Sequence, residues 1–406
     1  MINTKKISRE FESKSVDPMA SPLPSLPSEI FFDHILTRTS LESLGRCRLV
    51  SKDWNHITYD SRFWKSFCKR SNTVSGFLIQ SQSQIDGKHI QTFVSVDNKA
   101  NKNLSHAILD FLPVPVKIEA VSQGLVFCVN QNVSVVRDYF ICKPTTLQWE
   151  KLPNPKTRFL TSMTAMAVLS SKPLRYKIIR FSSHKYPFSK FKSRHEYYNM
   201  TCEVFHSNTW AWKRLKNVSL PYCVLLGIDQ PYVTSCGAFY WLVRCGAFYW
   251  LVRLARSNQV FAFYYGDDKE SWEIFDLPPP MEESGRFNYK KLVEYQGRLA
   301  LIICEREVMD LWVMENHGKK LWSKWKTWTL STKVFKQVEG YIPPLAALYN
   351  SDIALIKGRD EKLIFYNFED SSANVVSLGN QPHQVSKLQS DSERVNLRGR
   401  GRWQDF

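Results

Sequence analysis

The chain has two regions that differ in their pattern of apolar and polar positions. Between residues 24 and 67, apolar residues such as Phe31, Ile35 and Leu36 recur at the spacing of a buried helical face. After Asn72 the pattern changes to short runs of β-branched and aromatic residues bounded by Gly, Pro, Asn, Asp and Ser, which is typical of strands. The sequence therefore predicts a small helical module followed by a mostly β domain.

Three helices are expected in the first region. Ser28 and Ser40 are placed to cap the first and second of them, and the apolar series continues through Val50, Trp54 and Phe67. A segment of about forty-five residues buries too little surface to be stable alone. It nevertheless has more apolar residues than its own core can hide, so we expect it to complete its core on a partner.

The spacing of these residues resembles an F-box. The matching positions are Leu26-Pro27-x-Glu29-Ile30, Ile35-Leu36-x-Arg38, Leu41-x-x-Leu44, Arg48-x-Val50-Ser51-Lys52-x-Trp54 and Phe63. Thr39 and Ser51 depart from the usual pattern, but neither change removes a large apolar anchor. The resemblance implies docking onto the Skp-type adaptor of a cullin-based (SCF) ubiquitin ligase. Residues expected at or near that interface are Leu26, Pro27, Ile30, Ile35, Leu36, Leu44, Val50 and Trp54, with Arg48 and Lys52 at its polar rim.

The strand-like runs of the second region come in pairs, and the pairs recur. In each unit a glycine-led apolar run is followed by a second run and then by a Trp with polar neighbours. These Trp residues are Trp149, Trp212, Trp272 and Trp328, which by subtraction lie 63, 60 and 56 residues apart. A period near ~50 residues with several strands per repeat predicts propeller blades that stack around an axis. The expected strands begin at Gly124, Tyr139, Tyr176, Cys202, Gly246, Val260, Gly297, Asp310, Ile353 and Lys362.

These units resemble the plant F-box-associated domain, which is itself similar to kelch propellers. The matching segments are QGLVFCVN…YFICKPTTLQWEKLPNP, RYKIIRF…CEVFHSNTWAWKRL, CGAFYWLV…VFAFYYGDDKESWEIFDLPPP and YQGRLALIICE…MDLWVM. The expected fold is thus α+β and multidomain, with an all-α F-box module at 23–70 and a propeller-like domain at 75–370. Residues 1–22 are expected to be disordered, and the polar residues 371–406 to form a flexible tail.

The segment CGAFYWLVR occurs twice in succession, at Cys236–Arg244 and Cys245–Arg253. An insertion of nine residues within a sheet would reverse which side chains face the core, because side chains alternate along a strand. We therefore expect one copy to form a blade strand and the other to be an insertion. The same string of Phe, Tyr, Trp, Leu and Val is an aggregation hazard where it is exposed.

Composition adds a strong positive charge. The formal net charge is +17, from 55 Lys and Arg against 38 Asp and Glu. The basic residues are scattered, and no nucleic-acid module accompanies them, so nucleic acid is not the expected partner. A local excess lies between two expected strands, where Lys185, Lys190, Lys192 and Arg194 alternate with aromatic residues. This loop is the candidate surface for an acidic target protein, and a solvated loop without a partner is the alternative.

No catalytic pattern is present among the residues. The chain contains no Walker loop, dinucleotide fingerprint, nucleophile elbow or zinc-protease motif, and its nine His lack metal-ligand spacing. Its nine Cys, odd in number and without a CxxC pair, indicate free thiols in a reducing compartment. No apolar run approaches the ~20 residues of a membrane span. We expect no enzyme activity, no cofactor, no metal and no membrane partner.

Together these patterns predict a non-catalytic substrate receptor of an SCF-type ubiquitin ligase. The F-box would bind the Skp-type adaptor and through it a cullin scaffold, and the β domain would hold an unidentified target protein. Its expected location is the cytoplasm, the nucleus or both. A propeller-type binding protein whose degenerate F-box makes no ligase is the alternative, and a basic nucleic-acid-binding protein is a third reading that rests on charge alone.

Overall fold

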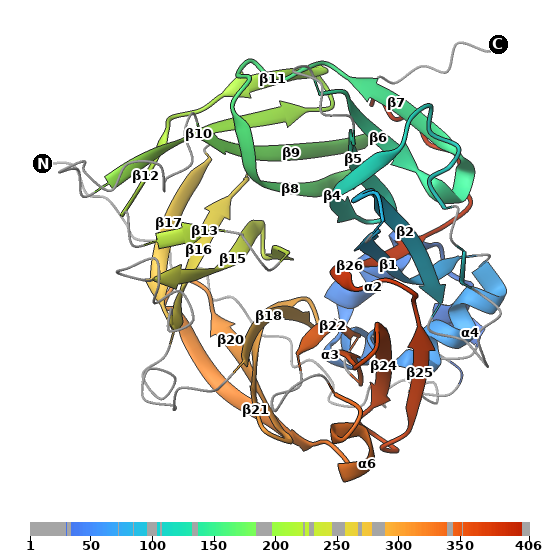
Figure 1. Ribbon diagram of the computed structural model, residues 1–406. Coiled ribbons are helices and arrows are strands. Elements are labelled where there is room, and N and C mark those ends of the chain that lie inside the picture. The colour runs from blue at the N-terminus through green and yellow to red at the C-terminus, as the bar shows by residue number, and fades with distance from the viewer. Residues whose placement is uncertain are drawn as a thin grey trace, which may run out of the picture.

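The architecture is a helical module followed by a closed ring of sheets (Figure 1). The computed structural model describes residues 30, 34–71, 73–83, 85–95, 104–105, 108–131, 137–183, 197–221, 224–226, 231–245, 256–266, 270–277, 289–338, 344–350 and 352–399. Within these ranges the strands form six antiparallel sheets arranged as the blades of a propeller. The predicted fold, a small all-α module and a mostly β propeller, is confirmed. The prediction of disorder at 1–22 falls outside the described residues.

The helical module consists of short helices joined by capped turns. As predicted, Ser40 is a helix cap, and its side-chain oxygen accepts a hydrogen bond from the backbone N–H of Ser43 at 3.1 Å. Ser51 caps the next helix in the same way, through the N–H groups of Asp53 and Trp54. The elements are η2 (Leu36–Arg38), α2 (Leu41–Val50), α3 (Lys52–Ile57) and α4 (Ser61–Ser71).

Each blade is an antiparallel sheet in which neighbouring strands lie at increasing distance from the central axis. Blade 1 contains β26 (Pro382–Ser390), β1 (Val74–Gln82), β2 (His89–Ser95) and β3 (Leu104–Ser105). Blade 2 contains β4 (Val116–Ser122), β5 (Leu125–Asn130), β6 (Tyr139–Lys143), η3 (Pro144–Thr146) and β7 (Gln148–Leu152). Blade 3 contains β8 (Leu160–Ser171), β9 (Leu174–Ser183), β10 (Tyr197–His206), β11 (Ala211–Arg214) and β12 (Val218–Pro221).

The second half of the ring repeats this plan. Blade 4 contains β13 (Val224–Leu226), β14 (Val233–Ser235), β15 (Ala238–Cys245), β16 (Arg256–Tyr264) and β17 (Ser271–Asp276). Blade 5 contains β18 (Tyr289–Tyr295), β19 (Arg298–Glu305), β20 (Val308–Asn316) and β21 (Leu321–Thr329), and is followed by α6 (Thr332–Phe335). Blade 6 contains β22 (Leu345–Tyr349), β23 (Ile353–Lys357), β24 (Lys362–Asn367) and β25 (Ala373–Ser377).

The recurring Trp and Gly residues occupy equivalent places in successive blades. Trp149, Trp212, Trp272 and Trp328 lie on β7, β11, β17 and β21, an outer strand of blades 2 to 5. The glycines before β5, β15 and β19 occupy two-residue turns from the preceding strand, in which both turn residues have positive φ. In the turn before β19, for example, φ is 51° at Gln296 and 78° at Gly297. Such turns match the right-handed twist of a hairpin and favour glycine at the second position.

The ring is closed by the C-terminal strand. β26 pairs with β1 along its length and neighbours both β22 and β4, so it is the innermost strand of blade 1 (Figure 1). The prediction that residues 371–406 form a flexible tail is therefore wrong for 373–390, and the propeller extends beyond the predicted boundary at residue 370. The apolar anchors of β26 are few because only some of its side chains face a blade. Val385 and Leu388 are buried, whereas His383 and Gln389 line the central channel.

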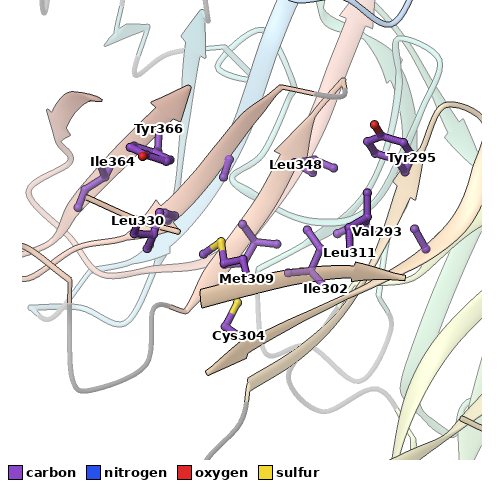
Figure 2. Close-up of a cluster of buried hydrophobic side chains, with 14 of the residues drawn as sticks. Val293, Tyr295, Ile302, Cys304, Met309, Leu311, Leu330, Leu348, Ile364 and Tyr366 are labelled. Atoms are coloured by element: carbon purple, nitrogen blue, oxygen red, sulfur yellow. The ribbon is translucent and has the colours of Figure 1, made fainter. Parts of the chain in front are cut away.

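Apolar side chains fill the space between neighbouring blades. Figure 2 shows this packing between blades 5 and 6, where Ile302, Met309 and Leu311 of blade 5 lie with Leu348 and Ile364 of blade 6 in one buried cluster. Equivalent clusters join blades 3 and 4 and blades 4 and 5. Because each sheet buries its faces on its neighbours, the stability of one blade depends on the next.

The helical module shares a core with the propeller. Phe63, Trp64 and Phe67 of α4 pack in one buried cluster with Phe77 of blade 1 and Phe365 of blade 6. In Figure 1 the helices lie behind these two blades, beside β1, β24 and β25. The excess of apolar residues in the module is thus partly buried within the same chain. The module thus completes part of its core on the propeller, whereas the sequence led us to expect a partner in that role.

The first copy of the repeated segment supplies the blade strand. Ala238–Cys245 forms β15, between β14 and β16, and most of the second copy lies outside the described residues, between the ends of β15 and β16. The strand expected at Gly246 is therefore formed by the equivalent residues of the first copy. The two strands pair as far as Cys245 and Arg256, so the second copy after Cys245 belongs to the connection between them.

Deleting Cys245–Arg253 is therefore expected to leave the propeller folded. Arg244 would then join Leu254 directly, and closure of the shorter loop costs slightly less entropy. We expect the thermal midpoint to be unchanged or higher, and the soluble yield to rise because a strand-prone apolar string is removed. Both can be measured on the full chain with and without the deletion. A lower midpoint would show that the second copy is part of the core.

None of the helices in the described ranges is both long and apolar enough to cross a membrane.

Candidate functional sites

The helical module exposes several large apolar side chains. Ile30, Ile35 and Val50, all expected at the adaptor interface, are exposed, Val50 to 68%. Leu49 was not expected there, yet it is exposed to 88%. Leu49 lies off the inner stripe of α2 formed by Leu41 and Leu44, and that helical spacing could have identified it. The four residues are candidates for contact with a partner.

Two of the expected interface residues are instead part of the intramolecular core. Leu36 and Leu44 are completely buried in the cluster that contains Trp64. Their side chains cannot contact an adaptor in this structure, so we reassign them to the support of the module. Trp54 is half-buried and packs against the same cluster, while Lys52 is exposed at the start of α3. Leu26 and Pro27 lie outside the described residues.

Arg48, expected at the polar rim of the interface, makes contacts within the module. Its guanidinium donates hydrogen bonds to the hydroxyl and the carbonyl oxygen of Thr58, at 3.1 and 3.2 Å, and lies 4.1 Å from the centre of the Tyr59 ring. These contacts hold the turn between α3 and α4. Arg48 therefore has a structural role in the module, and its polar contact with a partner stays a prediction.

Tyr59 is a residue of the helical module that lines the central channel of the propeller. Its hydroxyl would lie 3.1 Å from a Cβ placed on Gly297, in the turn between β18 and β19. Burial, with the nearby carboxylate of Glu294, raises the pKa of the Tyr59 phenol well above its ordinary value. Tyr59 thus stays protonated and places the module against blade 5 as well as blades 1 and 6.

The inner strands surround a cavity of about 890 Å³, in the size range of small-molecule sites. Arg48 and Tyr59 line it together with residues of the inner strands. Its basic lining groups are Arg48, Lys117, Lys291, Lys357, Lys387 and His383, against the two carboxylates Glu119 and Glu294. Sequence reasoning missed this site, since its basic residues are far apart in the chain and meet only through ring closure.

Two lysines that line the cavity have a partner nearby. Lys117 forms an ion pair with Glu119 at 2.9 Å. Lys387 donates a hydrogen bond to Asn350 Oδ1 at 2.8 Å and lies over the Tyr349 ring. Burial, opposed by the charge of Glu294 and reinforced by that of Arg48, lowers the pKa of Lys387 to about 8. The end of the cavity next to the helical module therefore holds charges of both signs.

The most deeply buried ion pair of the described residues is structural. Arg180 and Glu203 approach to 2.6 Å on the adjacent strands β9 and β10, and Thr157 donates two further hydrogen bonds to the Glu203 carboxylate. Every group is satisfied within blade 3, which favours a role in blade geometry over chemistry. Within the described residues no three His, Cys, Asp or Glu side chains gather as metal ligands would. The basic loop with Lys185, Lys190, Lys192 and Arg194 lies outside the described residues, so its proposed target contact stays a prediction.

Comparison with known proteins identifies both parts of the chain. A family model described as "F-box associated beta propeller domain" matches residues 62–377, and one described as "F-box-like" matches residues 23–70. "F-box protein At5g41720" of Arabidopsis thaliana is 35% identical over 155 residues, covering 36% of this chain and 82% of that protein. "F-box protein At4g19940" of the same plant is 24% identical over 393 residues, covering 91% of this chain and 86% of that protein.

Solved structures resemble the chain only loosely. TolB from Acinetobacter baumannii aligns with a TM-score of 0.43 at 11% sequence identity, over 82% of this chain and 71% of that chain.

Proposed function

Because this chain belongs to the F-box proteins that carry an F-box-associated β-propeller domain, we propose that it is the substrate-receptor subunit of an SCF-type ubiquitin ligase. Its F-box module binds a Skp-type adaptor, which connects it to a cullin scaffold. The propeller holds a target protein. The chain itself carries out no chemistry, and it acts in the cytoplasm, the nucleus or both.

The observation that supports adaptor binding most directly is the exposed apolar surface of the module. Leu49 and Val50 end α2 side by side with most of their side-chain surface in water, although the same module buries Leu36, Leu44 and Trp64 almost completely. Exposed apolar groups of this size on a small, otherwise well-packed module favour a partner surface. They also distinguish this proposal from a propeller whose F-box is degenerate, because a module without a partner has no need of them.

The shared core gives the receptor a defined geometry. Since α4 packs on blades 1 and 6, an adaptor on the outer side of the module would sit at a fixed distance and angle from the propeller. A target held by the propeller would then be positioned toward the ubiquitin-charged conjugating enzyme. Rate enhancement in this arrangement comes from proximity and orientation rather than from side-chain chemistry.

Replacing Leu49 and Val50 with Ala is expected to abolish adaptor binding. Each side chain, if it is a hot spot, contributes at least about 2 kcal/mol, or roughly 30-fold in affinity. Ala favours the helix, so the thermal midpoint of the protein should stay the same. The measurement is the affinity of the purified full chain for a Skp-type adaptor, with Ile85→Ala, an exposed apolar residue of blade 1, as the matched control. Equal affinity of the double variant and the wild type would disprove this interface.

The third reading, nucleic-acid binding, is separated by its salt dependence. A protein that neutralises several phosphates loses affinity steeply as salt concentration rises. Retention of the chain on heparin at low salt that collapses in this way, together with no adaptor binding, would favour that reading over the ligase.

A further inference from the structure

Lys291 is a buried lysine without a counter-charge. It lies on β18, the innermost strand of blade 5, is only 7% exposed and lines the central cavity. In the described part of the chain its ammonium group has no hydrogen-bond or ion-pair partner. A buried ammonium group without a partner is costly, so its presence in a cavity needs an explanation.

The surroundings of Lys291 are positive. Lys357, at the end of β23, is near enough for its charge to act on Lys291 and also on His383 of β26, and Lys117 of β4 acts on His383 as well. Blades 1, 2, 5 and 6 thus bring four basic groups to the same region. Of the two carboxylates that line the cavity, Glu119 is paired with Lys117, and Glu294 lies beside Tyr59 near the helical module.

Burial and the charge of Lys357 lower the pKa values of basic groups in the cavity. Burial, reinforced by Lys357, lowers the pKa of Lys291 to about 7, and burial with Lys357 and Lys117 lowers the pKa of His383. Near neutral pH the cavity therefore contains groups that would take up protons if a negative charge entered. Asn350 Nδ2, in the lining of the same cavity, is a second buried donor without a partner among the described residues. Water can satisfy an amide, but it cannot balance the charge of Lys291 when that side chain is protonated.

We propose that the central channel is a binding site for a small anion bearing phosphate or carboxylate groups, which Lys291 holds by an ion pair. Lys357 adds to the positive field, and His383 can take up a proton beside the bound anion. A small molecule fits better than a folded partner, because Lys291 lies inside the channel and the cavity has the volume of a small-molecule site. This site does not depend on the ligase function, and either proposal can fail without the other.

The test uses the full chain with inorganic pyrophosphate as the probe, at constant ionic strength set with sodium chloride. Pyrophosphate should raise the thermal midpoint in a saturable manner. Lys291→Met removes the charge and keeps the length of the side chain, and should weaken this binding at least tenfold while leaving the unliganded protein as stable or more so. Lys290→Met is the matched control, because Lys290 is the adjacent buried lysine, does not line the cavity and points to the other face of β18.

A second measurement detects the proton that Lys291 should gain. Citrate, which is fully ionised at about pH 8, is titrated calorimetrically in two buffers of different ionisation enthalpy. Binding to the wild type should take up protons, since an anion next to Lys291 raises its pKa, and Lys291→Met should take up fewer. Both results together would support the site.

Three outcomes would overturn the proposal. The first is that neither anion stabilises the wild type in a saturable manner, a result that does not require any variant to fold. The second is that Lys291→Met and Lys290→Met weaken binding equally, which indicates attraction by net charge alone. The third is that a phosphoserine peptide binds in the channel while both small anions do not, which would assign the channel to the target protein.

Discussion

Truncating the chain after Gly379 is expected to destroy the fold of the propeller. The deletion removes β26, so β1 loses a partner along its whole length and the contacts of blade 1 with β22 and β4 disappear. Leu388 and Val385 leave the core at the same time. Loss of a buried leucine alone typically costs about 2–5 kcal/mol, and a domain has about 5–15 kcal/mol in total. We expect no cooperative thermal transition and little soluble protein.

The residues after β26 add further ties that the truncation would also break. Lys143 of blade 2, buried, forms an ion pair with Asp391, and the Tyr176 hydroxyl of blade 3 donates a hydrogen bond to the Leu397 carbonyl oxygen at 2.9 Å. The segment after the closing strand thus crosses from blade 1 to blades 2 and 3. It holds the ring shut where the first and last strands of the propeller pair.

A synthetic peptide of residues 380–399 provides the control for this truncation. Added to the truncated chain, it should restore a cooperative transition, because it supplies the missing strand and its ties to blades 2 and 3. The same peptide with Leu388→Asp should not, since it would bury a carboxylate among apolar side chains. If the truncated chain melts at the same temperature as the full chain without any peptide, closure by β26 does not stabilise the ring.

The sequence predicted the middle strands of the blades well and the inner strands poorly. β5, β6, β19 and β24 are nearly continuous apolar runs because both of their faces pack against other blades. The inner strands place alternate side chains in the channel, so β4 and β26 contain Lys117, Glu119, His383 and Lys387 among their apolar residues. A strand of this kind looks like a polar loop or tail when it is read alone. Ring closure, a contact between distant parts of the chain, could not be inferred from local pattern.

The adaptor surface shows a related limit. The resemblance to the F-box identified the right segment, and the apolar spacing identified Leu36, Leu44 and Val50 as important. The apolar spacing did not show which of these residues face a partner, because the module packs on blades 1 and 6 through α4. Helical spacing gives the angle of each side chain around its own helix but not what lies opposite. Leu36 and Leu44 were assigned to the interface for this reason, and the cavity lysines were missed because four blades contribute to one site.

Replacing Trp64 with Ala is expected to destabilise the module and the propeller together. Trp64 is fully buried, packs edge-on against Phe67 with ring centres 5.4 Å apart, and donates its indole N–H to the Thr58 carbonyl oxygen at 2.9 Å. The change leaves a large cavity and removes one of the two hydrogen bonds that the Thr58 carbonyl oxygen accepts, at a cost of about 3–5 kcal/mol. Because the cluster includes Phe77 and Phe365, the whole chain should unfold in one transition at lower denaturant concentration.

Leu49→Ala is the matched control for Trp64→Ala, because Leu49 is exposed. Leu49→Ala should change the free energy of unfolding by no more than about 0.5 kcal/mol, while it reduces adaptor binding. Trp64→Ala should lower the free energy of unfolding and leave adaptor binding unchanged at temperatures where the variant is still folded. The Trp64 side chain is buried and so is not available to a partner. Denaturant unfolding followed by tryptophan fluorescence and by circular dichroism measures both parts. The contrary result is that Trp64→Ala shifts only a separate transition of the helices and leaves the sheet signal unchanged. That result would show that the module and the propeller do not share a core. The position of the adaptor relative to the propeller would then not be fixed.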